Sequence, residues 1–390
     1  MQGIDTGEQG PELGRHGAGW WPSRSGPHGP MRRQARGQGA APRPRPQASV
    51  GQRGRGQGQA PEKGKDKGKG PRPSGEILFF AYTLSGSEPT SQEDIFGVEA
   101  ATSAVRRLTD HSSGMPFVSD RDPAWSPDRS QMVFMSGDAA APMHLPVLSA
   151  AGAPVADLAV EGTTPVWLDG ATVVCSVHRL GADGVWDRAD LVAVDVPSGA
   201  VHPLTAVASG HYLGEPAWHP SSGLGATLSV YDPVTMSFED QHLVLADPTS
   251  VTATLAGGPA LTVSDFVDIA PGHQWGAGPA WSPDGSLLAF SATRPCATAG
   301  PDGTAVLQMD VAMLTLATGT VEWVTDDTSG DYDDGLNDGS PAFSPDGRWL
   351  AWVRGHEDDW TRIMVKRLNH PSEAKVLLNG QQWFRWGLAW

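Results

Sequence analysis

The sequence has 390 residues, 39% of them hydrophobic, and a formal net charge of −16. Residues 1–75 hold 14 of the basic and 5 of the acidic residues, a net charge of +9, so residues 76–390 carry −25. An acidic body of this kind repels phosphate groups, which argues against nucleic acid as its main partner. The sequence contains no apolar run near the roughly 20 residues needed to cross a bilayer, so no membrane span is expected.

Residues 1–75 are predicted to form a disordered basic tail. Gly, Pro, Arg and Gln dominate it, and Lys63, Lys65, Lys67 and Lys69 alternate mainly with glycine. Such a segment cannot bury enough apolar surface to offset the entropy cost of ordering, and it lacks the apolar core of a signal peptide. A solvated linker, or translated upstream sequence, is the favoured interpretation. The alternatives are a basic arm that contacts nucleic acid or another anionic surface, and a spacer that extends from a membrane.

A strand–turn–strand unit recurs through residues 76–390. Its clearest copy is residues 279–291 (PAWSPDGSLLAFS). Pro, Asp and Gly favour a tight turn, and the apolar run LLAF suits a strand that is covered on both faces. In chain order, the copies begin at Pro123, Pro165, Pro216, Pro279 and Pro341, and a partial copy ends the chain.

Each copy carries an aromatic residue in its first strand. These anchors are Trp125, Trp167, Trp218, Trp281, Phe343 and, in the partial copy, Trp390. Their successive separations are 42, 51, 63, 62 and 47 residues. Spacings of this size are typical of a four-stranded propeller blade, with loop insertions in the longer repeats. Because the anchors recur at one position of the blade, we expect them to pack between blades.

The first blade is predicted to be closed by the end of the chain. Residues 77–82 (ILFFAY) have the character of a blade's second strand, and residues 94–98 and 105–109 follow as the third and fourth. No first strand precedes them, whereas residues 388–390 supply one without partners. The C-terminal strand should therefore pair with the first blade, which gives six blades in total and leaves no open sheet edge there.

The P-A-[WF]-S-P-D-G turn followed by an apolar strand resembles the WD40-like PD40 repeat of TolB-like propellers, over most of residues 77–390. The resemblance implies an all-β, six-bladed β-propeller at residues 76–390. It also implies a non-catalytic scaffold, periplasmic or extracytoplasmic, that binds a protein or peptide partner at the loops of its channel mouth. The chain departs from TolB in showing neither a signal peptide nor a small α/β domain before the propeller. We expect a monomer.

An enzymatic role is the alternative, because the same repeat occurs in propellers of prolyl-oligopeptidase and dipeptidyl-peptidase type peptidases and of polysaccharide lyases. The sequence contains no G-x-S-x-G, H-E-x-x-H, C-x-x-C or P-loop pattern. We therefore predict no catalytic residues. Cys175, in an apolar run, is expected to be a core residue, and Cys296 is expected to lie in a loop.

The most conspicuous polar segment is residues 326–338, between the fifth and sixth blades. Its acidic residues are the candidate binding residues of the rim: Asp326, Asp327, Asp331, Asp333, Asp334 and Asp338. Clustered carboxylates suit Ca²⁺, but Ala342 stands where an EF-hand loop needs a bidentate glutamate. A solvated acidic turn is favoured over a Ca²⁺ site, and no other cofactor is expected.

Three histidines fall in predicted connections between blades: His111, His211 and His273. Convergence on a metal ion, as in some polysaccharide-lyase propellers, is one interpretation. Unrelated surface or packing histidines are the favoured one.

Overall fold

The computed structural model describes residues 72–85, 88–111, 118–138, 142–182, 184–232, 237–273, 277–295, 307–326, 336–356, 360–370, 374–380 and 383–390. The chain divides into two units, and the fold below is that of the second, Pro71–Trp390. Most of the predicted basic tail lies outside the described residues.

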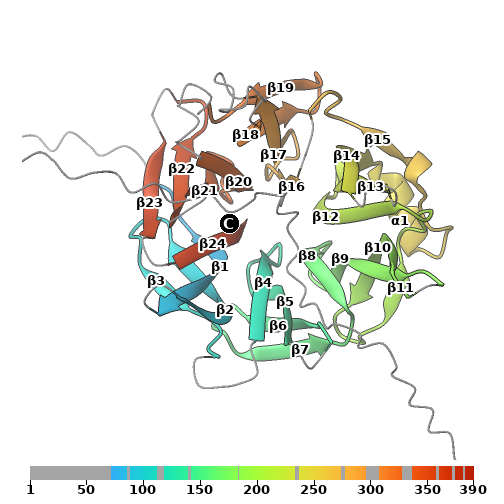
Figure 1. Cartoon of the computed structure of the whole chain (residues 1–390), viewed down its shortest axis with the longest axis horizontal. Helices are drawn as coiled ribbons and strands as arrows, with labels where there is room; N and C mark the ends of the chain where they lie inside the picture. The colour runs from blue at the N-terminus through green and yellow to red at the C-terminus, as the bar shows by residue number, and fades with distance from the viewer. Residues whose placement is uncertain are drawn as a thin grey trace, which may run out of the picture. The chain divides into compact units, whose positions relative to one another are not determined.

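Within the described residues, the strands form six antiparallel groups of four, the blades of a propeller, around a common centre (Figure 1). One parallel residue pair joins blade 1 to blade 2, and another joins blade 3 to blade 4. Each blade is given from its inner to its outer strand. Blade 1 is β24 (Trp383–Ala389), β1 (Glu76–Ser85), β2 (Glu88–Glu99) and β3 (Val105–Arg107). Blade 2 is β4 (Val118–Trp125), β5 (Gln131–Asp138), β6 (Leu145–Ser149) and β7 (Pro154–Leu158). Blade 3 is β8 (Gly162–Trp167), β9 (Thr172–Leu180), β10 (Trp186–Asp195) and β11 (Val201–Pro203).

The second half of the ring repeats this order. Blade 4 is β12 (His211–His219), β13 (Gly223–Asp232), β14 (Ser237–Ala246) and β15 (Phe266–Asp268), with α1 (Pro248–Leu255) and a 3-10 turn (Val263–Asp265) before β15. Blade 5 is β16 (Ala277–Trp281), β17 (Leu287–Pro295), β18 (Leu307–Thr315) and β19 (Thr320–Trp323). Blade 6 is β20 (Leu336–Phe343), β21 (Trp349–His356), β22 (Trp360–Arg367) and β23 (Lys375–Gly380).

The hydrophobic core is divided among the interfaces between neighbouring blades. One buried cluster lies at each interface, and the cluster between blades 6 and 1 completes the ring. In β1, Ile77 and Phe79 pack toward blade 6, whereas Leu78 and Phe80 pack toward blade 2. Side chains alternate between the two faces of a strand. A strand that is covered on both faces therefore needs an unbroken apolar run, as the sequence predicts.

The C-terminal strand closes blade 1, which confirms the prediction. β24 pairs with β1 antiparallel, with Leu78 opposite Ala389 and Phe80 opposite Trp386. The Trp390 indole also donates a hydrogen bond of 3.0 Å to the Ser74 carbonyl oxygen. The red and blue ends of the propeller lie side by side in Figure 1. Without β24, the inner edge of β1 would expose unpaired backbone groups.

The S-P-D-G turn is held by the same hydrogen bonds in blades 2, 5 and 6. In blade 5, the Ser282 hydroxyl donates to Asp284 at 2.7 Å and accepts from the Leu287 N–H at 2.9 Å. The hydrogen bonds from Ser282 and Ser286 lower the pKa of Asp284 to about 2. In blade 2, Arg129 occupies the position of the glycine with a φ of 59°, a conformation that costs a non-glycine residue energy.

The aromatic anchors join consecutive blades. The indole N–H of Trp167 donates to the carbonyl of Ala124 at 3.1 Å, and that of Trp281 donates to the carbonyl of Ala217 at 3.2 Å. Each acceptor residue directly precedes the anchor of the blade before. Trp125 makes a similar bond of 3.3 Å to the Glu76 carbonyl. Trp167 and Phe343 are buried, and Trp218 packs at the edge of the cluster between blades 3 and 4.

Every inner strand contains an irregular residue pair at the same place. The residue three positions before the anchor has a φ between 48° and 57° in each blade. These residues are Asp122, Thr164, Glu215, Gly278, Ser340 and Gly387. The strand register shifts at each of them, as in a β-bulge. Only two of the six are glycine, so the bulge is imposed by the blade and not by the local residue type.

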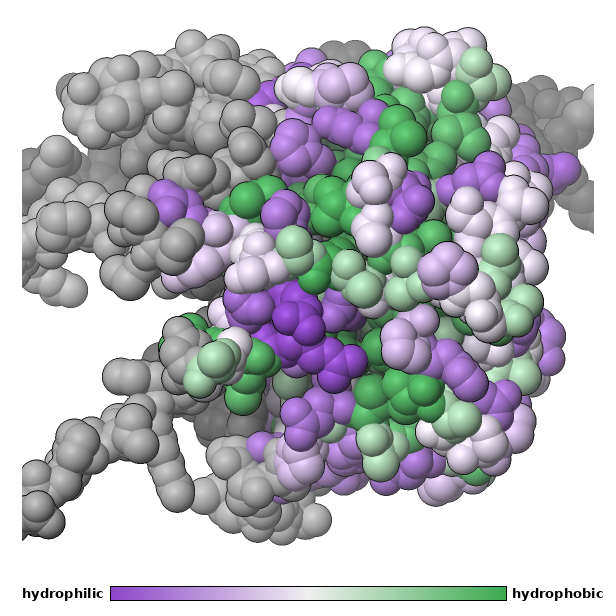
Figure 2. All heavy atoms as spheres, turned by 90° about the vertical axis from the view of Figure 1, so that its right-hand side faces the viewer, coloured by the Kyte–Doolittle hydropathy of each residue, from purple (hydrophilic) through white to green (hydrophobic). Residues whose placement is uncertain are grey.

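The outer edges of the blades mix hydrophilic and hydrophobic residues. Figure 2 views the side on which blades 3 and 4 lie and shows no continuous hydrophobic surface over the residues that it colours. Val201 and Val267 are exposed apolar side chains on this side. Isolated exposed apolar residues of this kind are normal in folded proteins. Across the described part of the chain, the helices are too short to traverse a lipid bilayer.

Candidate functional site

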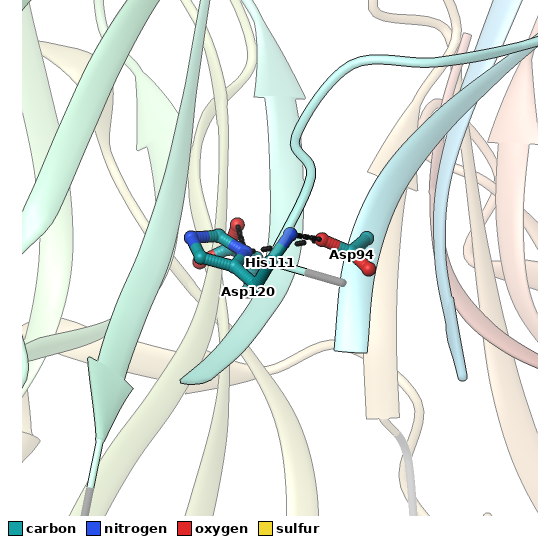
Figure 3. Close-up of side chains that lie close together, drawn as sticks. All are labelled: Asp94, His111 and Asp120. Carbon is teal, nitrogen blue, oxygen red and sulfur yellow. Dashed lines mark hydrogen bonds and ion pairs between the residues drawn. The ribbon is translucent and has the colours of Figure 1, made fainter. Parts of the chain in front are cut away.

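Three ionisable side chains meet between blades 1 and 2. Asp94 lies on β2, Asp120 on β4, and His111 on the connection between β3 and β4 (Figure 3). A single parallel pair, Glu93 opposite Ser119, joins β2 to β4. Asp94 and Asp120 are the next residues along their strands. The pairing of the two blades therefore brings these residues together, although they are distant in the sequence.

His111 lies between the two carboxylates. Its Nδ1 is 3.0 Å from Oδ1 of Asp94 and 3.4 Å from Oδ2 of Asp120. Its backbone N–H donates to Oδ1 of Asp94 at 3.1 Å, which fixes the connection against β2. Arg107 binds the other oxygen of Asp94 and also lies 2.9 Å from Asp110. Asp94 is therefore held from both sides.

Asp120 is the least compensated member of the group. Its residue is 0% exposed, and neither carboxylate oxygen accepts a hydrogen bond of good geometry. Burial raises the pKa of Asp120, and the nearby Ser136 and Thr109 hydroxyls and His111 oppose this effect. A buried carboxylate without a strong partner is costly in free energy. The site therefore favours a positive charge beside Asp120.

An open pocket of about 330 Å³ adjoins the cluster. His111 and Asp120 line it together with residues of blade 2 and of the connection: Thr109, Asp110, Phe134, Ser136, His144, Pro146, Leu148, Pro154, Ala156 and Asp157. The lining thus combines apolar side chains with two histidines and three carboxylates. A pocket of this composition can hold a side chain of a partner by apolar contact and orient it by charge.

The interface of blades 5 and 6 contains the equivalent pair of aspartates. Asp310 has the position of Asp94 in the third strand, and Asp338, like Asp120, stands five residues before the anchor. Both are fully buried, but each is paired with an arginine. Arg354 binds both oxygens of Asp338, at 2.8 and 2.6 Å, and Arg294 binds Asp310 at 2.7 Å. Arg354 is opposite Asp338 in the strand pairing, and Ser136 is opposite Asp120.

The predicted acidic rim is only partly described. Asp326 is exposed and lies 2.8 Å from Arg294, whereas Asp338 is buried in β20. The remaining rim residues, Asp327, Asp331, Asp333 and Asp334, lie outside the described residues. The predicted Ca²⁺ site therefore stays a prediction.

The other residues that the sequence singled out lie apart from the cluster. His211 is at the start of β12, and the His273 ring packs against Phe290 and Trp323 in blade 5. Of the three predicted inter-blade histidines, the described residues place only His111 in a group of three candidate metal ligands. Cys175 is buried, and burial raises the pKa of its thiol to about 12, as fits a core residue.

Sequence reasoning noted His111 but missed Asp94 and Asp120. A signal was available in the repeats themselves. The segments DRDPAW and DGSPAF both place an aspartate five residues before the anchor, and the segments DIFGV and DVAML within the third strands both begin with aspartate. Alignment of the copies would have marked these positions, but it would not have shown that their partners differ.

No family model matches the sequence, and no curated protein matches it. Among solved structures, TolB from Acinetobacter baumannii superposes with a TM-score of 0.57 at 14% identity, over 81% of this chain and 66% of that chain. Hydrazine synthase from Kuenenia stuttgartiensis superposes with a TM-score of 0.51 at 12% identity, over 82% of this chain and 47% of that chain. A structure described as a putative TolB from Agrobacterium tumefaciens has a TM-score of 0.48 at 16% identity, over 80% of this chain and 97% of that chain. The chain thus spans just under two thirds of the Acinetobacter protein.

The described part of residues 71–390 is a β-propeller of six four-stranded blades. Within that class its fold is that of the TolB-like propellers, as the repeats predict. Identities of 12% and 14% show the fold alone.

Proposed function

We propose that this propeller is a non-catalytic scaffold that binds a basic segment of a protein or peptide at the connections between its blades. The observation that carries the proposal is the pocket between blades 1 and 2, with its apolar wall and carboxylate rim. The TolB-like fold supports a protein partner, and by the same resemblance an extracytoplasmic compartment is proposed with it.

Charge favours a basic partner. Asp110, Asp157 and Asp326 are 64%, 69% and 71% exposed at their side chains. Asp110 and Asp157 line the pocket, and Asp326 has the position of Asp110 in the connection that follows blade 5. In addition, residues 76–390 carry a net charge of −25. Such a surface attracts cationic segments and raises their association rate.

The test measures binding of the full chain to two peptides of equal length, one lysine- and arginine-rich and one acidic, by biolayer interferometry. Exposed pairs contribute modestly, so the combined D110N, D157N and D326N changes should weaken basic-peptide binding about 3- to 30-fold. Added salt should weaken it as well.

Glu322→Gln, on the outer strand of blade 5, is the matched control because it removes one exposed carboxylate away from the pocket. Equal affinity for the two peptides, or an equal loss in the control and the triple variant, would contradict the proposal.

A further inference from the structure

We infer that Asp94, His111 and Asp120 form a binding site for a divalent transition-metal ion, Zn²⁺ being the best fit. The inference goes beyond the proposed function, because the metal would bind with no partner present. It rests on the geometry of the three donors, on the charge of Asp120, and on the comparison with blades 5 and 6.

The donor spacing suits a common metal ion. One oxygen or nitrogen from each residue lies within 4.8 Å of the other two, and Nδ1 of His111 is 3.0 and 3.4 Å from the nearest carboxylate oxygens. Bonds of about 2.1 Å to one Zn²⁺ ion place adjacent donors about 3.0–3.4 Å apart, for coordination angles of about 90–110°. Both distances from His111 therefore match those of donors that share an ion, and the two carboxylates lie within 4.8 Å of each other.

The charge of the site calls for a cation. Asp120 is 0% exposed, borders the pocket, and has no hydrogen-bond donor of good geometry at either oxygen. At the equivalent place in blade 6, the guanidinium of Arg354 binds both oxygens of Asp338. Blade 2 has the short Ser136 opposite Asp120, which leaves room where the guanidinium would lie. A metal ion would supply the missing positive charge.

The surroundings orient the donors. Arg107 binds Oδ2 of Asp94, so Oδ1 is the oxygen directed at His111. The Thr109 hydroxyl, 3.4 Å away, and the His111 backbone N–H also donate to Oδ1. Such outer contacts fix metal ligands in position and raise affinity.

The donor set indicates the kind of ion. One imidazole nitrogen and two carboxylate oxygens suit Zn²⁺ or Mn²⁺ better than Ca²⁺, which prefers six to eight oxygen ligands. Three protein ligands leave at least one coordination position, and the pocket beside His111 and Asp120 gives solvent access to it.

The test is isothermal titration of ZnCl₂ into the full chain after EDTA treatment and dialysis. The expected result is one tight site per chain, and D120N should weaken it at least about 100-fold, since it removes a ligand and its charge. Ser136→Arg should have the same effect by placing a guanidinium at Asp120, and H111Q, on the connection, gives a third variant that alters no strand. Circular dichroism verifies the fold of each variant.

His242→Gln is the matched control. His242 faces Asp268 at 3.0 Å, the same distance as in the proposed site, but it has no place in a group of three ligands among the described residues. The control should bind Zn²⁺ as the wild type does. Wild-type binding no tighter than that of D120N would overturn the inference. Loss of the site in H242Q would overturn it too.

Discussion

The interface of blades 5 and 6 and the interface of blades 1 and 2 bury aspartates at the same positions but compensate them differently. Asp338 accepts two hydrogen bonds from the Arg354 guanidinium, one at each carboxylate oxygen. Asp120 faces Ser136 across the strand pair, and among the described residues His111, at 3.4 Å, is the one basic side chain within 4.0 Å of it. These two interfaces therefore share the buried acids and differ in the partner of each acid.

The comparison distinguishes a buried carboxylate that is already paired from a buried carboxylate that can still bind a cation. A buried ion pair with bidentate geometry is satisfied and has no need of a ligand. A buried carboxylate whose partner is a histidine at a pocket can accept an added cation. The same blade geometry thus yields a closed site at one interface and a binding site at another.

Removal of β24 is expected to have the largest effect and to affect the two interfaces unequally. Truncation after residue 382 leaves β1 with an open edge and removes the strand that lies between β20 and β4. We expect the melting temperature to fall by about 10 °C or more. Hydrogen exchange should accelerate first in β1 and β4, and later in β17 and β18. An unchanged melting temperature would contradict the closure of blade 1 by β24.

Substitution of Arg354, which pairs with the buried Asp338, should have the next largest effect on stability. R354M leaves Asp338 buried without its cation, so we expect a loss of about 3–5 kcal/mol in the free energy of unfolding. Urea denaturation at pH 7 measures it. The double variant R354M/D338N should recover most of the loss, because no buried charge remains. A double variant as unstable as R354M would show that packing by the arginine, and not its charge, stabilises the interface.

The sequence predicts the blades better than it predicts the site. The P-A-W and S-P-D-G segments are local, so turn chemistry and strand length follow from them. The C-terminal closure follows because residues 388–390 have no other partner. The bulge at Asp122 and Glu215 could not be predicted from residue type, since a positive φ there is imposed by the blade. The contacts of Asp120 could not be predicted either. They depend on the packing of β4 against β2, and on Ser136 at the place that Arg354 has in blade 6.

The interface of blades 3 and 4 extends the comparison to a histidine that packs against aromatic rings. Leu213 occupies the place of Asp120, and His178 packs against Trp186, with ring centroids 4.5 Å apart. Burial lowers the pKa of His178 to about 4 from 6.5. The unfolded chain then binds the proton more readily than the folded chain, so stability falls as pH decreases from 6.5 to 4.

H178F removes this dependence of stability on pH and keeps an aromatic ring against Trp186. The free energy of unfolding of the wild type should fall by up to about 3 kcal/mol more than that of H178F between pH 7 and pH 4. Melting curves across this range measure the difference. His202→Gln, an exposed histidine of β11, should follow the wild type. Parallel curves for H178F and wild type would contradict a buried neutral His178.

The smallest expected effects on the free energy of unfolding come from neutralising Asp120 and Asp338, and the two effects should have opposite signs. In EDTA, D120N should raise the free energy of unfolding by about 1 kcal/mol, because an amide is less costly to bury than an uncompensated carboxylate. D338N should lower it by about 2 kcal/mol or more, because Arg354 loses a charged partner. Urea denaturation of both variants at pH 7 gives the comparison directly. Equal destabilisation by the two would mean that Asp120 is as well compensated as Asp338, and that a histidine contact of 3.4 Å serves this fold as well as a bidentate arginine.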